Sequence, residues 1–224
     1  MILVVSVAGC TESARRLGGE IHASGRATVS GAPDIAVLYL GVGVTRTSVA
    51  EARELAADAL SSVVSAVKGA GVEQEDVRTS SFSIQPSYDY GSGEARFLGH
   101  EVLNVLSVTV RDVEAAGDVL DSAVAAGGSF TRVRDVTFRV ADRTSLEREA
   151  RRLALRDAIA KADYYAAELG VRRGRILRVS DLDGAVRALE VDRFRVSRQS
   201  LSSTSLYAGD VEVSAEIGVV VAIE

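Results

Sequence analysis

The chain has 224 residues, of which 47% are apolar and 25% are charged, and its formal net charge is −5. This length fits one large domain or two small ones with enough apolar material for a core, which excludes wholesale disorder. The acidic balance argues against a general nucleic-acid binder, and one cysteine with two histidines can complete neither an internal disulfide nor a zinc cage. The sequence therefore predicts no nucleic-acid partner, no metal and no cofactor.

The first ten residues are similar to an export signal that ends in a lipidation site. Residues 1–9 form a short apolar run, and Val7-Ala8-Gly9-Cys10 is similar to the lipobox at which bacterial lipoproteins are cleaved and acylated. The run lacks the usual positive charges before it, so a start further upstream and an ordinary N-terminal strand are the alternatives. On the signal interpretation, Cys10 carries a lipid anchor to a membrane, residues 11–25 are a polar tether, and the protein lies in the cell envelope.

The remaining residues, 26–224, are expected to form one α+β lobe. Alternation with a period of two predicts strands, and apolar residues three or four positions apart predict helices. In chain order, the predicted elements are a strand over residues 25–45, a helix over 49–68, a hairpin of strands over 77–88 and 102–110, a helix over 112–127, a strand over 135–140, a helix over 144–169, and strands over 174–180 and 211–223. The order β-α-β-β-α-β-α-β-β favours a mixed or antiparallel sheet with two to three packed helices.

Local signals indicate how some of these elements begin and pack. Ser48 with Glu51 and Thr144 with Glu147 match the capping-box pattern at the start of a helix. Residues 181–209 show no sustained period and are interpreted as a long loop, which in a compact domain is either an interaction element or mobile.

Several stretches in the same order resemble the SIMPL-domain family. They are Gly25-Arg-Ala-Thr-Val-Ser-Gly-Ala-Pro33-Asp34, then Gly71-Val-Glu-Gln-Glu-Asp76 through Tyr90, then Phe97-Leu-Gly99-His100 through Asp112, and then Leu153-Ala-Leu-Arg-Asp157-Ala158 through Val171. Within them, Pro33 is expected at a bend because it fixes φ and lacks an N–H group, and Asp34 is expected to accept a nearby backbone N–H. His100 departs from the family, where an aromatic residue is usual, and residues 181–209 match nothing in it.

The resemblance implies a bacterial envelope or secreted protein with an α/β lobe. It also implies homo-oligomers, which are large rings or channels in some relatives, and a link of some relatives to oxidative-stress defence. The family has no established catalytic residues, so the resemblance assigns none to this chain.

Motifs for common chemistry are incomplete in this sequence. Gly41-Val-Gly43 lacks the third glycine of a dinucleotide site and falls late in a strand, so its glycines are expected to allow close packing against a neighbouring helix. Asp181-Leu-Asp183-Gly184 lacks the further ligands of a calcium loop. A Gly-x-Ser-x-Gly elbow is absent, which argues against an α/β-hydrolase.

Two sets of residues are candidates for interaction. Aromatic residues flank the Gly-Ser-Gly tip of the predicted hairpin and suit anchors at a protein interface, namely Tyr88, Tyr90 and Phe97. The alternative is a tip folded back on its own core. Arginines of the strand near residue 135 and of the long loop are candidates for a positive strip, namely Arg132, Arg134 and Arg139 with Arg193, Arg195 and Arg198. Pairing with nearby carboxylates is the alternative for them.

The first functional hypothesis is a non-enzymatic envelope protein that acts through homo-oligomerisation or partner contacts, with a role in envelope or oxidative-stress defence. The alternative is a module that binds a small envelope ligand or a cell-wall fragment through the arginine-bearing strand face and the long loop. An uncharacterised hydrolase ranks below both.

Overall fold

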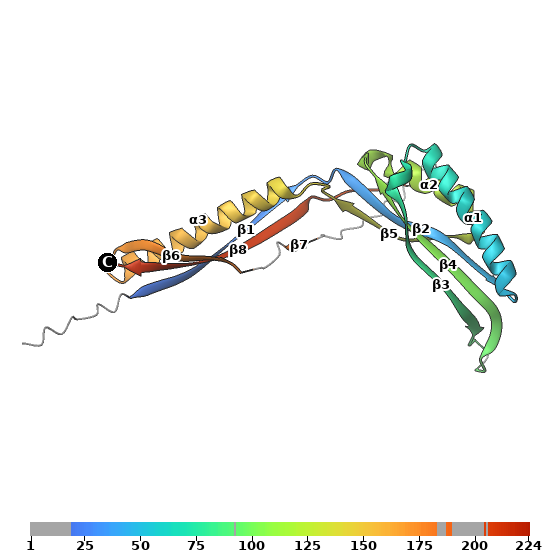
Figure 1. Ribbon diagram of the computed structural model, residues 1–224, viewed down its shortest axis with the longest axis horizontal. Coiled ribbons are helices and arrows are strands. Elements are labelled where there is room, and N and C mark those ends of the chain that lie inside the picture. The colour runs from blue at the N-terminus through green and yellow to red at the C-terminus, as the bar shows by residue number, and fades with distance from the viewer. Residues whose placement is uncertain (1–18, 92, 183–186, 190–203, 205) are drawn as a thin grey trace, which may run out of the picture. The chain divides into compact units, whose positions relative to one another are not determined.

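The computed structural model describes residues 19–91, 93–182, 187–189, 204 and 206–224 (Figure 1). Their contacts divide the chain into two compact units. Unit 1 holds the described residues of 1–27, 151–185 and 215–224, and unit 2 holds those of 28–150 and 186–214. The strands form two antiparallel sheets, with the orders β1-β8-β6 and β3-β4-β2-β5, and β7 also pairs with β8. The predicted α+β class is confirmed.

The elements follow one another from strand β1 to strand β8. Their bounds are β1 Glu20–Gly31, β2 Ile35–Arg46, α1 Val49–Gly69, β3 Val77–Asp89, β4 Arg96–Val110, α2 Ala116–Gly127, β5 Thr131–Arg139, α3 Thr144–Glu168, β6 Arg173–Asp181, β7 Arg187–Leu189 and β8 Val211–Ile223, with short 3₁₀ turns at Gln74–Asp76, Val113–Ala115 and Gly128–Phe130. The three predicted helices are confirmed within a few residues of their predicted ends, and the predicted hairpin of β3 and β4 is confirmed, although β4 begins at Arg96 and not at Val102.

The stretch over residues 25–45, predicted as one strand, is two strands separated at Pro33. Pro33 has no N–H group to donate, and the residues around it leave β1 before β2 begins at Ile35. The carboxylate of Asp34 accepts the backbone N–H of Ala141 at 2.7 Å. The backbone N–H of Asp34 donates to the carbonyl of Arg139 at 3.0 Å. Asp34 therefore bonds to the segment after β5, and the prediction that it stabilises its own turn is wrong.

Two predicted boundaries also change. Strand β1 begins at Glu20, so residues 20–25 belong to a strand and not to the tether, because Ile21 and Ala23 alternate into a core. The predicted loop over residues 181–209 contains strand β7, which pairs with β8. The proposed signal segment, Cys10 and the loop arginines Arg193, Arg195 and Arg198 lie outside the described residues.

In unit 2, helices α1 and α2 lie on one face of the sheet β3-β4-β2-β5 (Figure 1). Every second residue of β2 points into the resulting core, and α1 contributes residues four and seven positions apart. These buried residues are Ala36, Leu38, Leu40, Val42 and Val44 of β2, with Ala52, Ala56, Val63 and Val67 of α1. Helix α1 begins after Ser48 as predicted, yet the Ser48 side chain makes no capping bond. Glu51 instead pairs with Arg46 at 3.3 Å.

The two glycines of β2 point away from the helices, on the opposite face from Leu40 and Val42. A Cβ atom on Gly41 would meet the backbone carbonyl oxygen of Asn104 in β4 at 1.9 Å. The nearest atom to a Cβ atom on Gly43 would be in the Arg132 side chain, at 3.1 Å. The expectation that these glycines pack against a helix is therefore wrong, because their neighbours are a strand backbone and a flexible side chain.

In unit 1, helix α3 packs on the sheet through a stripe of small residues. These are Ala154, Ala158, Ala162 and Ala166, each at most 2% exposed. They allow the helix and strand backbones to approach closely. A Cβ atom on Gly25 of β1 would lie 2.2 Å from the carbonyl oxygen of Ala154 and from the amide nitrogen of Ala158. The dense packing expected for this helix is confirmed.

Helix α3 also bonds to the backbone of β1. The carboxylate of Asp157 accepts the N–H of Arg26 at 3.0 Å and the ammonium of Lys161 at 2.8 Å. Lys161 also donates to the carbonyl of Ser24 at 3.2 Å. The hydrogen bonds from Lys161 and Arg26 lower the pKa of Asp157, so their contribution to stability is present at neutral pH and is lost as the pH falls through that lowered pKa. The Asp157–Lys161 pair thus occupies backbone groups that an added strand would need.

Candidate functional site

The end of the β3–β4 hairpin carries an exposed aromatic cluster. The strands pair from Val77 with Val108 to Asp89 with Arg96. Figure 1 shows the hairpin extending past the end of α1. The rings of Tyr88 and Phe97 meet edge to face with centroids 5.6 Å apart, and Tyr90 lies 6.3 Å from Tyr88. The structure therefore brings together the three aromatic residues that the sequence singled out.

These rings do not fold back on the core of unit 2. Tyr90 is 70% exposed, Phe97 47% and Tyr88 43%. The ring centroids of Phe97 and His100 are 5.3 Å apart. His100 stands where the family usually has an aromatic residue, and its ring still makes a contact with an aromatic side chain. Clustered, half-exposed aromatic side chains are typical of contact surfaces, because each can bury a large area at a small entropic cost.

A groove runs along α1 on the same side of the sheet as the helices. Two adjoining cavities of about 620 and 430 Å³ share Ala57 and Asn104 in their linings. The first is lined further by Leu60, Ser61, Val64, Ser65 and Lys68, and the second by Ala50, Arg53, Glu54, Ala56, Phe82 and Val102. The groove exists because α1 covers β2 and β4 and leaves the edge strand β3, with its exposed Phe82, outside its reach.

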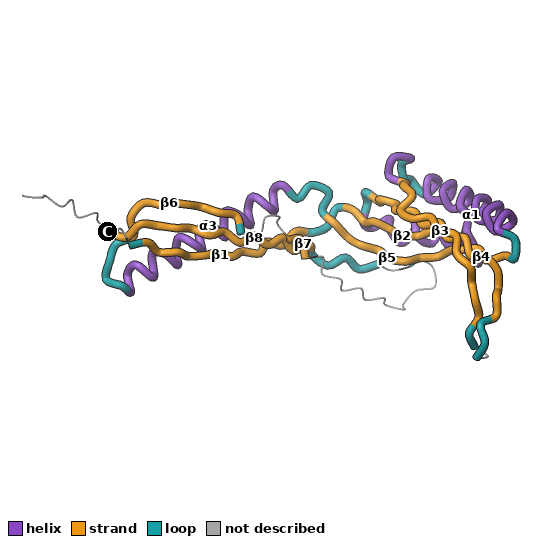
Figure 2. Tube along the Cα trace, turned by 60° about the horizontal axis from the view of Figure 1, so that its bottom comes forward, coloured by secondary structure: helices purple, strands orange, loops and turns teal. Residues whose placement is uncertain are grey.

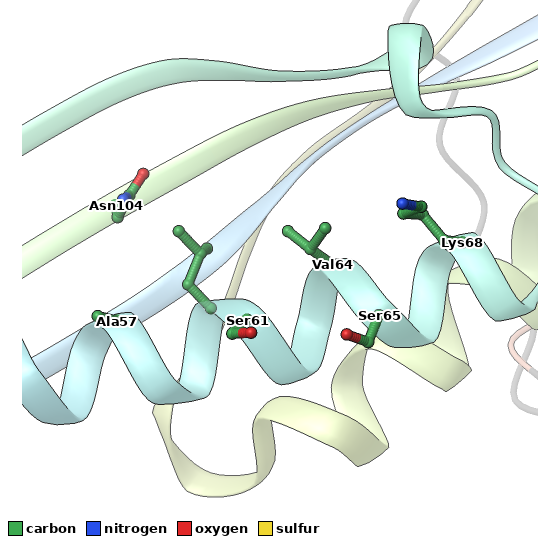
Figure 3. Close-up of a pocket in the computed structure, with 7 residues that line it drawn as sticks. Ala57, Ser61, Val64, Ser65, Lys68 and Asn104 are labelled. Atoms are coloured by element: carbon green, nitrogen blue, oxygen red, sulfur yellow. The ribbon is translucent and has the colours of Figure 1, made fainter.

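Asn104 is the polar group at the centre of this groove. Figure 3 shows it on β4, opposite the face of α1 that carries Val64 and Lys68. Its side-chain oxygen is buried and has no hydrogen-bond partner. A buried acceptor without a partner costs free energy, so a bound amide or hydroxyl group that donated to it would be favoured. Asn104 gives no signal in the sequence, because it occupies an ordinary strand position. It is unusual only because α1 leaves this part of the sheet uncovered.

The arginines Arg132, Arg134 and Arg139 do not converge on one site. Arg132 lies against Gly43 and donates to the carbonyls of Ser129 and Thr131 at 3.1 and 2.9 Å. Arg134 falls at a register shift between β2 and β5, and Arg139 is paired with Ile35 at the other end of β5. Arg139 lies seven strand positions beyond Arg132, which is roughly 23 Å. Among the described residues, these three arginines therefore form no convergent anion site.

An ion pair that the sequence did not predict joins two residues of the family stretches. Arg111, just after β4, donates to both carboxylate oxygens of Asp76, at 2.7 and 2.9 Å. Asp76 is mostly buried, and its hydrogen bond raises the pKa of Arg111 above its ordinary value. The pair joins the start of β3 to the end of β4, which is a structural role for both residues. Their separation of 35 residues hides the pair from any local pattern.

Within the part of the chain that the structure describes, no group of three His, Cys, Asp or Glu side chains is placed to hold a metal ion. The two histidines lie apart, His22 beside Glu20 at 3.4 Å and His100 beside the carbonyl of Thr47 at 3.4 Å. Among the described helices, none is long and apolar enough to cross a membrane.

A family model described as "SIMPL: Protein of unknown function (DUF541)" matches residues 21–221, and the chain belongs to this family. The predicted family resemblance is thereby confirmed. The chain is 30% identical to the 26 kDa periplasmic immunogenic protein of Brucella melitensis, over 89% of this chain and 83% of the relative. It is 28% identical to the uncharacterized protein YggE of Escherichia coli K12, over 73% of this chain and 66% of the relative. Neither name is that of an enzyme.

Proposed function

We propose that this chain is an extracytoplasmic SIMPL-domain protein that acts through contacts between protein copies and not through catalysis. The observation that carries the proposal is the exposed aromatic cluster of Tyr88, Tyr90 and Phe97 at the end of the β3–β4 hairpin. Such rings bury large apolar areas when they meet a partner surface. The edge strand β3, whose Phe82 is exposed, continues this surface along the hairpin.

Two observations support the location. The Brucella melitensis relative is named a periplasmic protein. The segment Val7-Ala8-Gly9-Cys10 is similar to a lipobox. Mass spectrometry of membrane fractions tests the anchor. A diacylated N-terminal Cys10 is expected, and an intact Met1 in soluble protein would contradict it.

A role in oxidative-stress defence is carried by the family resemblance alone, and peroxide sensitivity of a deletion strain tests it.

Self-association is expected to depend on the aromatic hairpin. Light scattering at micromolar concentration should find an oligomer for the unaltered chain, and the double variant Tyr90→Ser with Phe97→Ser should associate at least about 30-fold more weakly, since two anchor residues are each worth roughly 1–2 kcal/mol or more. Both side chains are largely exposed, so the variant should keep the fold and the melting temperature.

Tyr207→Ser is the matched control, because Tyr207 is a similarly exposed tyrosine of unit 2 outside the hairpin. It should leave the association constant unchanged. A monomer at every concentration would overturn self-association. An oligomer that is equally weakened by Tyr207→Ser would show that the hairpin is not the contact.

The second candidate function is binding of a small envelope ligand, which the unpartnered Asn104 oxygen in the α1 groove favours. A groove of this size with a few polar groups in an apolar lining is the usual form of a small-molecule site. N-acetylglucosamine supplies an amide donor and a methyl group and is a suitable probe. Chemical-shift changes at Asn104 and Val64 that disappear in Asn104→Leu would support this function, and their absence at millimolar sugar would contradict it.

A further inference from the structure

Strand β6 of unit 1 is exposed on both of its faces. Ile176 is 41% exposed, Leu177 39% and Val179 52%, and Arg175 and Arg178 are exposed with them. We propose that this basic edge, defined as residues Arg175, Ile176, Leu177, Arg178 and Val179, docks on an anionic lipid surface. This inference goes beyond the proposed function, since it concerns other residues and a different class of partner.

The exposure of the basic edge follows from where α3 lies on its sheet. The helix contacts Gly25 of β1 through the backbone of Ala154 and Ala158, on the far side of β8 from β6. Figure 2 shows β1, β8 and β6 side by side, with β6 at the outside. Ile176 and Val179 are paired with Val221 and Val219 of β8, which are buried. The side chains of Ile176 and Val179 therefore point to the face of the sheet on which α3 lies, but α3 does not cover them.

Two ion pairs bracket the basic edge. Arg151 of α3 lies 3.2 Å from Asp181 at one end of β6, and Asp163 of α3 pairs with Arg173 at the other end. Between these pairs, Arg175 and Arg178 make no ion pair with any residue that the structure describes. Their charges are thus available to an external partner.

The charge of this segment selects an anionic partner. From Leu169 to Ser180 the sequence has four arginines and no acidic residue, although the whole chain carries a net charge of −5. Antiparallel pairing of two β6 strands from separate copies, in the register centred between Ile176 and Leu177, would place Arg175 opposite Arg178, which is destabilising. The chemistry therefore favours a negatively charged surface over a second copy of the same edge.

The combination of arginine with aliphatic side chains favours a lipid surface as the partner of the basic edge. An edge strand that is only protected against aggregation carries charges without large exposed apolar residues, whereas here three aliphatic side chains are exposed on the same strand as the arginines. Tyr164 and Tyr165, in the last turns of α3 before β6, add two exposed rings with centroids 5.8 Å apart. Arginine, tyrosine and aliphatic residues are the types that settle at the boundary between headgroups and acyl chains.

The two edges of the sheet in unit 1 differ in a way that agrees with this assignment. On β1, the Asp157–Lys161 pair bonds to the backbone of Ser24 and Arg26. Strand β6 ends its sheet with no further strand among the described residues. Only nine residues separate Cys10 from Glu20, so an anchor at Cys10 would hold the start of β1 within roughly 30 Å of the membrane.

Vesicle sedimentation tests the proposal with the full chain carrying Cys10→Ser, so that acylation plays no part. The protein is expected to sediment with vesicles of phosphatidylglycerol and phosphatidylethanolamine, to sediment far less with phosphatidylcholine alone, and to dissociate at high salt. The double variant Arg175→Gln with Arg178→Gln should partition about 30-fold less, because each arginine near an anionic surface contributes roughly a fivefold factor. The control Arg53→Gln with Arg134→Gln removes two exposed arginines of unit 2 and should partition as the unaltered chain does.

A tryptophan reporter locates the contact, because the chain contains no tryptophan. Val179→Trp should shift its emission to shorter wavelength on adding anionic vesicles and should be quenched by brominated lipid. Val124→Trp, at a similarly exposed position of α2, should do neither. Each variant is first checked for an unchanged melting temperature.

Absence of sedimentation, equal binding to phosphatidylcholine, or equal partitioning of the two arginine pairs would overturn the proposal. So would an Arg175→Gln with Arg178→Gln variant whose only change is in oligomer mass, which would assign the edge to a protein contact. A negative vesicle result leaves self-association through the hairpin untouched, and loss of self-association in the hairpin variant leaves vesicle binding untouched.

Discussion

Gly41→Ala is expected to destabilise unit 2 far more than Gly43→Ala, although both change a glycine of β2 in the same way. A Cβ atom at position 41 would lie 1.9 Å from the carbonyl oxygen and 2.8 Å from the carbonyl carbon of Asn104. Backbone atoms in a paired strand cannot move aside without breaking the β2–β4 register. We expect a loss of roughly 3 kcal/mol in the free energy of unfolding, at the upper end of the usual cost of overpacking.

The comparison with Gly43 makes the test specific. A Cβ atom there would meet the side chain of Arg132 at 3.1 Å, and that long side chain can shift. Urea unfolding followed by circular dichroism should give a change for Gly43→Ala of under about 1 kcal/mol. Equal free energies of unfolding for the two variants would contradict the close approach of β2 and β4 at Gly41.

Gly25→Val is expected to separate α3 from β1. Its side chain would enter the space of the Ala154 carbonyl oxygen and the Ala158 amide nitrogen, each 2.2 Å from a Cβ atom at position 25. The helix must then move outward and expose its alanine stripe, at a cost of about 3 kcal/mol or more. Displacement of α3 would also weaken the bonds of Asp157 and Lys161 to the backbone of Arg26 and Ser24.

Hydrogen exchange is the suitable measurement, because it reports on each unit separately. Amides of α3 should exchange faster in Gly25→Val, while amides of α1 and β2 in unit 2 keep their protection. Gly69→Ala is the control, since no atom lies within 4 Å of a Cβ atom at that position and alanine favours a helix. Unchanged protection of α3 in Gly25→Val would contradict the packing of α3 on β1.

Local periodicity explains what could be predicted. The steps of three and four in α1 and the alternation of β8 from Val211 to Val221 are properties of neighbouring residues, and both elements match their predicted extents. The aromatic residues around the hairpin tip were identified for the same reason. The turn and the two strands that bring Tyr88 and Phe97 together lie within 34 residues of sequence.

Long-range contacts explain the corrections. Asp34 bonds to Ala141, 107 residues away, and Gly41 lies against Asn104, so neither partner is visible to a local pattern. The arginines of β5 were predicted to form one strip because they lie close together in the sequence. The register shift at Arg134 and the bonds of Arg132 to its own turn disperse them.

By itself, the sequence determined the α+β class, the helices, the antiparallel hairpin and the family, because each follows from short-range periodicity or from residues in a fixed order. The tertiary structure decided which apolar residues are covered. Ile176 and Val179 pair with buried residues of β8, but α3 lies over β1 and meets β6 through ion pairs near the two ends of that strand, so both side chains stay exposed. Phe82 is exposed beside the α1 groove for the same physical reason, since a helix covers only the strands within the reach of its side chains.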